Sequence, residues 1–142
     1  MKRQYMQLSN TSKYTIRILA YMVNHKDTGP ISAKELSENL TIPYKFLTKI
    51  MTELTRVGFI TSTRGREGGF QFLREASKIT IADIMELFND AIKDEACILG
   101  IESCNSKKKC AMHDQWIKSK VQLQKMFKES TIENIAGKGD KI

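Results

Sequence analysis

Apolar residues recur at helical spacing in the first part of the chain. Between residues 10 and 25 they occupy more than one side of the predicted helix, which indicates a helix that is buried on most of its surface. Gly29 and Pro30 then interrupt the pattern. The sequence Ser32-x-x-Glu35 has the form of a capping box, and it predicts the start of a short second helix.

The third helical segment is the most regular in the chain. Pro43 suits the first turn of this helix, which we expect to continue to Val57 and to end at Gly58. When each residue turns the helix by about 100°, one face is apolar and carries Phe46, Leu47, Ile50, Met51, Leu54 and Val57. The opposite face carries Lys45, Thr48, Lys49, Thr52 and Arg56.

The order of these helices predicts DNA binding. A polar face on a single helix is usually just solvated. Here a short helix, a tight turn and an amphipathic helix with small, hydroxylic and cationic outer residues follow one another, which is typical of a helix-turn-helix. This motif lays its second helix in the major groove. We expect Lys45, Thr48 and Lys49 nearest the bases, while Thr52 and Arg56 complete the predicted contacts of this helix.

Two short strands are predicted after the third helix. Residues 59–63 and 70–73 favour strands, and the glycine-rich sequence RGREGG joins them. This pattern predicts a β-hairpin wing, because glycine permits the backbone that a tight turn needs. Arg64 and Arg66 lie in the turn, where we expect them to reach a phosphate or the minor groove of DNA.

Charge is unevenly distributed along the 142 residues, whose net charge is +7. Residues 41–74 hold six basic and two acidic residues, an excess of four, whereas most charged residues between 83 and 95 are acidic. A basic balance alone also fits a solubilising surface, but this segregation favours docking on double-stranded DNA. No apolar run approaches the ~18 residues of a membrane span. Because the N-terminus also lacks the features of a secretion signal, we expect a cytoplasmic protein without membrane contact.

The second half of the chain predicts a dimer. Thr80-x-x-Asp83 starts a fourth helix, a long helix follows His113, and residues 131–136 predict a short helical turn. One arc of the long helix carries Met112, Trp116, Leu123, Met126 and Phe127, and Ile117 and Val121 lie on another side. A helix at the end of a small domain buries one side against its own fold. The second apolar side therefore predicts a partner chain, most simply a homodimer.

All three cysteines and one of the two histidines lie between residues 97 and 113. In this loop six, five and two residues separate four candidate ligands, which are Cys97, Cys104, Cys110 and His113. Buried cysteines often act only as small apolar residues, but the solvated run over residues 105–109 does not suit a core. An odd cysteine count also argues against a disulfide framework. Because four such side chains can close around one metal centre, we predict a metal site.

Several segments match one protein family in the same order. They are MQLSNTSKYTIRILAYM, the predicted helix-turn-helix, STRGREGGFQFLR, the three-cysteine loop and CAMHDQW. Together they resemble the Rrf-two (Rrf2) family of bacterial winged-helix transcriptional regulators over about residues 6–136. The RGxxGG wing and the Cys-x5-Cys-x2-His spacing are the most specific parts. The resemblance implies a homodimer whose cysteine loop holds an iron-sulfur cluster and whose cluster state tunes transcription.

The resemblance also implies a ligand set. Carried over from the cluster-assembly branch, the ligands are Cys97, Cys104, Cys110 and His113, and a 2Fe-2S cluster is favoured over a 4Fe-4S cluster. The first interval is one residue longer than is usual in that branch, which leaves the cluster type open. In the nitric-oxide branch a carboxylate before the first-helix tyrosine is a ligand, but here Lys13 precedes Tyr14, which favours His113. The implied partners are a DNA operator, a second copy of the chain and the cluster-assembly machinery.

The expected fold is mainly α with a small β-hairpin. We expect a winged helix-turn-helix over residues 1–80, the cluster loop and dimerisation helix over residues 81–136, and a mobile tail over residues 137–142. Two alternatives keep this fold: a structural Cys3His zinc site, or a metal-free thiol sensor in which residues 107–109 favour the thiolate form of a cysteine. A redox enzyme or electron carrier is a third alternative. The sequence has no nucleotide or flavin motif, so we expect no enzymatic activity.

Overall fold

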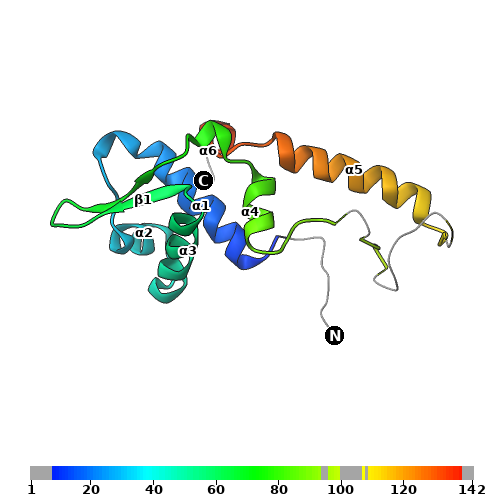
Figure 1. Cartoon of the computed structure of the whole chain (residues 1–142), viewed down its shortest axis with the longest axis horizontal. Helices are drawn as coiled ribbons and strands as arrows, with labels where there is room; N and C mark the ends of the chain where they lie inside the picture. Colours follow the sequence, from blue (N-terminus) through cyan, green and yellow to red (C-terminus); the bar gives the residue numbers. More distant parts are fainter. Residues whose placement is uncertain (1–7, 94–95, 100–106, 108, 139–142) are drawn as a thin grey trace.

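The chain folds into a bundle of helices with one β-hairpin that projects at one end (Figure 1). The computed structural model describes residues 8–93, 96–99, 107 and 109–138. In chain order the elements are α1 (Asn10–Asn24), the 3-10 turn η1 (Lys26–Thr28), α2 (Ala33–Leu40), α3 (Tyr44–Arg56), β1 (Ile60–Thr63), β2 (Gly69–Phe72), the 3-10 turn η2 (Ala76–Lys78), α4 (Ile81–Leu87), α5 (His113–Glu129) and α6 (Ile132–Lys138). The predicted fold class, mainly α with a small β-hairpin, is confirmed.

Helix α1 is buried on most of its surface, as its apolar pattern predicts. Ile18 and Leu19 have no exposed surface. Ser12 and Thr15 are also fully buried, and Thr15 Oγ1 donates a hydrogen bond to the carbonyl of Thr11 at 2.7 Å. Burying a hydroxyl costs little once it is hydrogen-bonded. Small polar residues therefore fit this helix where other elements pack closely against it.

Helices α2 and α3 pack together as a helix-turn-helix. Ser32 caps α2 by accepting a hydrogen bond from the backbone N–H of Glu35 at 3.1 Å. Thr41 follows α2 with a left-handed φ of 54°, which turns the chain toward α3. Pro43 is the N-cap residue of α3, one position before the first turn that was predicted for it. At the other end, Gly58 has a φ of 82° and ends the helix as predicted.

The buried face of α3 is narrower than its apolar pattern predicts. Its four core residues, each at most 3% exposed, are Leu47, Ile50, Met51 and Leu54. The assignment of Phe46 to this face is wrong, because its side chain is 56% exposed. Phe46 lies about 90° around the helix from the middle of the buried face. The neighbouring elements cover only the narrower arc, so the ring remains in solvent.

The wing is an antiparallel hairpin in which Ile60 pairs with Phe72 and Thr63 pairs with Gly69. Ile31, which lies before α2, also pairs with Phe70, and their backbones exchange hydrogen bonds of 3.1 and 2.8 Å. Gly69 makes this approach possible, since a Cβ at this position would lie 2.6 Å from the Ile31 carbonyl carbon. The predicted hairpin is therefore confirmed and is joined to the segment before the helix-turn-helix.

Helix α6 returns to the first helix of the chain and packs against α1. Ile132 has no exposed surface, and its backbone N–H donates to the carbonyl of Ile79 at 2.9 Å. The helical turn predicted for residues 131–136 is thus confirmed. Helix α5 extends away from the bundle, so the wing and the His113 end of α5 lie at opposite ends of the molecule (Figure 1). Among the described residues no helix is long and apolar enough to cross a membrane.

The inward face of α5 differs from its predicted pattern. Trp116 is buried there with His113 and Lys120, whereas Met112 and Met126 are 40% and 49% exposed. Of these three residues of the predicted arc, Trp116 is buried, whereas the two methionines remain at the surface. Helix α5 faces the backbone carbonyls of Ile92 and Ala96 as well as α4. Side chains that combine an apolar body with a polar end suit such a surface.

Candidate functional site

The predicted DNA-contacting face of α3 is open to solvent. Lys45, Lys49, Thr52 and Arg56 are exposed, and Thr48 is half-buried. The hydroxyl of Thr48 donates to the carbonyl of Lys45 at 3.0 Å, and the hydroxyl of Thr52 donates to the carbonyl of Thr48 at 2.8 Å. Because these protons are used within the helix, the threonines offer oxygen lone pairs and methyl groups to the outside. Both can contact base edges in a major groove.

The three cations of α3 differ in their partners. Within the described residues, neither Lys45 nor Lys49 forms an ion pair. Arg56 instead binds Glu53 of the same helix, with 3.0 Å from Nε and 2.7 Å from Nη2 to one carboxylate oxygen. The hydrogen bond to Glu53, together with its charge, raises the pKa of Arg56 above the ordinary value. To bind DNA, Arg56 would have to exchange the carboxylate of Glu53 for a phosphate. We therefore expect Arg56 to contribute less to DNA affinity than the other predicted contacts.

The two wing arginines lie in the turn between β1 and β2, and both are exposed. Neither Arg64 nor Arg66 has an ion-pair partner in the part of the chain that the structure describes. The turn needs glycine: Gly65 has a φ of 118°, and a Cβ at Gly68 would lie 2.1 Å from the carbonyl oxygen of Thr63. The glycines thus shape a tight tip from which both guanidinium groups project toward solvent.

Two aromatic residues on α3 were absent from the predicted DNA contacts. Tyr44 is 57% exposed and Phe46 is 56% exposed, and both belong to the first turn of the helix. Helical periodicity assigned Phe46 to the core, and it gave no reason to single out Tyr44. The sequence could have indicated both residues through their position in the first turn after the N-cap Pro43, because the first turn of a recognition helix meets base edges.

The cysteine loop is described only in part. Cys97 is half-buried and Cys110 is exposed, whereas Cys104 lies outside the described residues. His113, the first residue of α5, is 8% exposed, and its backbone N–H donates to the carbonyl of Cys110 at 3.1 Å. The described residues bring no three potential ligands together. With one predicted ligand outside them, the four-residue set remains a prediction.

Helix α5 is tied to the segment before Cys97. The indole Nε1 of Trp116 donates a hydrogen bond to the carbonyl of Ala96 at 2.7 Å, and Gln124 Nε2 donates to the carbonyl of Ile92 at 2.8 Å. These bonds satisfy backbone carbonyls of an irregular segment. They also hold the residue before Cys97 against the same helix that begins at His113.

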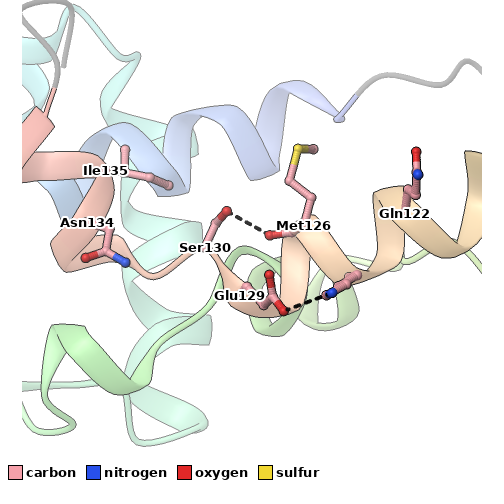
Figure 2. Close-up of a pocket in the computed structure, with 7 residues that line it drawn as sticks. Gln122, Met126, Glu129, Ser130, Asn134 and Ile135 are labelled. Atoms are coloured by element: carbon pink, nitrogen blue, oxygen red, sulfur yellow. Dashed lines mark hydrogen bonds and ion pairs between the residues drawn. The ribbon is translucent and has the colours of Figure 1, made fainter.

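A groove runs along the outer side of α5 and the start of α6 (Figure 2). It is lined by Gln122, Lys125, Met126, Glu129, Ser130, Asn134 and Ile135. The hydroxyl of Ser130 donates to the carbonyl of Met126 at 2.7 Å, so a side chain satisfies this carbonyl in the last turn of α5 (Figure 2). Val121, five residues before Met126 and about 140° around the helix from it, is 54% exposed. The outward-facing half of α5 therefore presents apolar side chains to solvent between charged ones.

Comparisons with known proteins agree on one family. The model of the Rrf2 family, described as an iron-dependent transcriptional regulator, matches residues 8–138. A protein of Aquifex aeolicus named as an HTH-type transcriptional regulator is 38% identical and covers 92% of this chain and 91% of its own length. The HTH-type transcriptional regulator IscR of Photorhabdus laumondii is 23% identical, with 95% of this chain and 87% of its own length covered.

Solved structures with the same fold include two named regulators. CymR, the global cysteine regulator of B. subtilis, has a TM-score of 0.81 at 20% identity and covers 96% of this chain and 100% of its own. IscR of T. potens has a TM-score of 0.70 at 20% identity and covers 92% of this chain and 85% of its own. The relatives are named as transcriptional regulators, which is not an enzymatic role. The chain belongs to the Rrf2 family of DNA-binding transcriptional regulators.

Proposed function

We propose that this regulator binds its operator as a homodimer and that an iron-sulfur cluster tunes the binding. The proposed ligands are Cys97, Cys104, Cys110 and His113. The proposed DNA contacts are Lys45, Thr48, Lys49, Thr52 and Arg56 of α3 and Arg64 and Arg66 of the wing.

The exposed basic surface of α3 and the wing supports the DNA contacts. Lys45 and Lys49 on α3 and the two wing arginines, all without ion-pair partners among the described residues, are available to phosphates. Thr48 and the lysines at the start of α3 lie where a recognition helix reads base edges. We therefore assign the wing mainly to affinity and the first turns of α3 to sequence preference.

The start of α5 is the observation that carries the cluster proposal. His113 is buried there, three positions after Cys110, and Trp116 of the same helix holds the residue before Cys97. Thus two segments that carry proposed ligands meet at one helix end. Three thiolates and one imidazole are a donor set that suits an iron-sulfur cluster, and histidine ligation raises the reduction potential of such a centre. We favour a 2Fe-2S cluster over a 4Fe-4S cluster.

The exposed outer side of α5 supports the homodimer. Met126 lines the groove shown in Figure 2, and Val121, about 140° around the helix from Met126, is also exposed. A second copy related by a two-fold axis would cover the exposed side of α5 in both protomers at once. A dimer also fits the proposed DNA contacts, because it places two recognition helices on two half-sites about one helical turn, or a multiple of it, apart.

Anaerobic purification followed by absorption spectroscopy, iron analysis and acid-labile sulfide analysis tests the cluster. We expect a coloured protein with iron and sulfide in equal amounts. Stoichiometric zinc without sulfide would instead identify the structural Cys3His site. Binding of the same preparation to DNA, before and after removal of the cluster by a chelator, then tests whether the cluster tunes DNA binding.

A metal-free thiol sensor is the second candidate. Cys110 is exposed, and Lys109 beside it is bound to Asp114 at 3.6 Å, so a basic group and a thiol meet at the surface. Among the solved structures with this fold is the oxidized form of Staphylococcus aureus CymR. Intact-protein mass spectrometry of a sulfide-free preparation treated with hydrogen peroxide tests this candidate. Oxygen addition at Cys110 that changes DNA binding would support it.

A further inference from the structure

Two aromatic side chains are exposed in the first turn of the proposed recognition helix. Tyr44 is 57% exposed and Phe46 is 56% exposed. Single exposed apolar residues are common on soluble proteins. Two aromatic rings within three residues, in the helix turn that a helix-turn-helix presents to DNA, are a more specific arrangement.

The two rings lie on opposite sides of the polar face. From the middle of the buried face, Tyr44 is about 70° around the helix in one direction and Phe46 about 90° in the other. Lys45 lies between them on the outer side, facing away from the core. The rings therefore flank the part of α3 that we assign to base contacts, instead of extending the core.

The dimensions of the major groove place such flanking residues near base edges. A helix with its side chains is about 10–12 Å across, and the groove is about 12 Å wide. When the first turn enters the groove, its flanking side chains meet the edges of the base pairs beside the groove floor. Thymine presents its C5 methyl group there, and this methyl is the one apolar feature that distinguishes bases in the groove.

We propose that Phe46 and Tyr44 read thymine methyl groups, so that each operator half-site places A·T pairs under the first turn of α3. Phe46 has no hydrogen-bonding group, so an apolar contact is the specific base contact available to its ring. Tyr44 adds a second ring and a hydroxyl that can donate a hydrogen bond to a phosphate. The inference rests on the proposed DNA contacts of α3 and extends them from cationic residues to apolar ones.

Replacing thymine by uracil tests the inference, because uracil lacks only the methyl group. The purified full chain first selects a site from a randomised DNA duplex. That site is then made with thymine, or with uracil at one position at a time, and binding is measured by fluorescence anisotropy. Uracil outside the bound region is the control for altered DNA. We expect wild-type binding to weaken about fourfold for each contacted methyl, which is the fold-change for about 0.8 kcal/mol per buried methyl.

Variants assign the effect to the rings. Phe46→Ala should bind the thymine duplex more weakly and should lose the preference for thymine at its position. Tyr44→Ala should do the same at a second position, whereas Tyr44→Phe keeps the ring and the preference. Leu73→Ala removes another exposed apolar side chain, 65% exposed beyond β2, and should leave the preference intact. Lys49→Ala should weaken binding to both duplexes equally.

Three results would overturn the inference. They are a selected site without A·T pairs under α3, wild-type binding that does not distinguish uracil from thymine, and an unchanged preference in both alanine variants. The first two need no variant, so they stand even if a substitution disturbs folding. Failure of the wild type to select any duplex would instead overturn the proposed DNA contacts as a whole. The two proposals therefore fail in different ways.

Discussion

The hydroxyl of Ser12 in α1 donates a hydrogen bond to Oδ2 of Asp90, just beyond α4, at 2.5 Å. The same oxygen accepts the backbone N–H of Ser9 at 2.9 Å and the hydroxyl of Ser9 at 2.6 Å. One carboxylate thus joins the start of α1 to the segment that leads to the cysteine loop. Since α1 also packs against α3, Asp90 links the two halves of the proposed regulator.

Replacing Asp90 by alanine should lower the free energy of unfolding by about 2–3 kcal/mol. The change leaves the fully buried hydroxyl of Ser12 without its charged acceptor, and bonds to charged groups are the stronger ones. Urea unfolding followed by circular dichroism measures the effect. Asp27→Ala, at an exposed position, is the matched control and should change stability by less than about 0.5 kcal/mol. Equal stabilities of the two variants would show that the Asp90 bonds contribute little.

Replacing both wing arginines by alanine should weaken DNA binding for all sequences alike. Each phosphate contact that is lost should reduce the slope of log affinity against log salt by about 0.9. Anisotropy titrations over a series of salt concentrations measure the slope. Arg56→Ala should have a smaller effect, because Glu53 already neutralises that guanidinium. Lys128→Ala removes one positive charge far along the chain, at the end of α5, and an equal loss of affinity per charge there would contradict a specific role for the wing.

Two different substitutions of His113 should change the lifetime of the cluster in opposite directions. His113→Cys adds a thiolate, so the cluster should have a lower reduction potential and should persist longer. His113→Ala removes the ligand, so the cluster should be lost readily. Reconstitution, redox titration and the decay of absorbance in air measure these properties. Unchanged potential and lifetime in both variants would place the fourth ligand elsewhere.

A charge on the outer side of α5 should separate the proposed dimer. Val121→Glu and Met126→Glu each place a carboxylate on a surface that a second copy would bury, and an unpaired buried charge is costly. Sedimentation velocity should show monomers, and operator binding should weaken because each monomer contacts one half-site. Val121→Ile keeps the apolar surface and should remain dimeric. A dimer that persists in both glutamate variants would move the interface away from this side of α5.

Local patterns were sufficient for the elements of the DNA-binding half. The capping signal at Ser32 and the glycine at position 58 mark helix ends because each acts on its own few residues. The exposed cations of α3 and of the wing also followed from the sequence, since a charged side chain without a partner stays in solvent. The cysteine and histidine spacing predicted a ligand set in the same way, although Cys104 lies outside the described residues.

Tertiary packing decided the features that depend on distant segments. Phe46 is exposed because the neighbouring elements cover only a narrow arc of α3. The spacing of apolar residues shows which side of a helix is buried, but not how wide the buried arc is. Trp116 and Lys120 face inward because α5 meets backbone carbonyls as well as apolar side chains. Gly69 is required by the approach of Ile31, far away in the sequence. The amino-acid sequence by itself determined the order and approximate positions of the helices and strands, whereas the packing of one element on another determined which side of each is available for function.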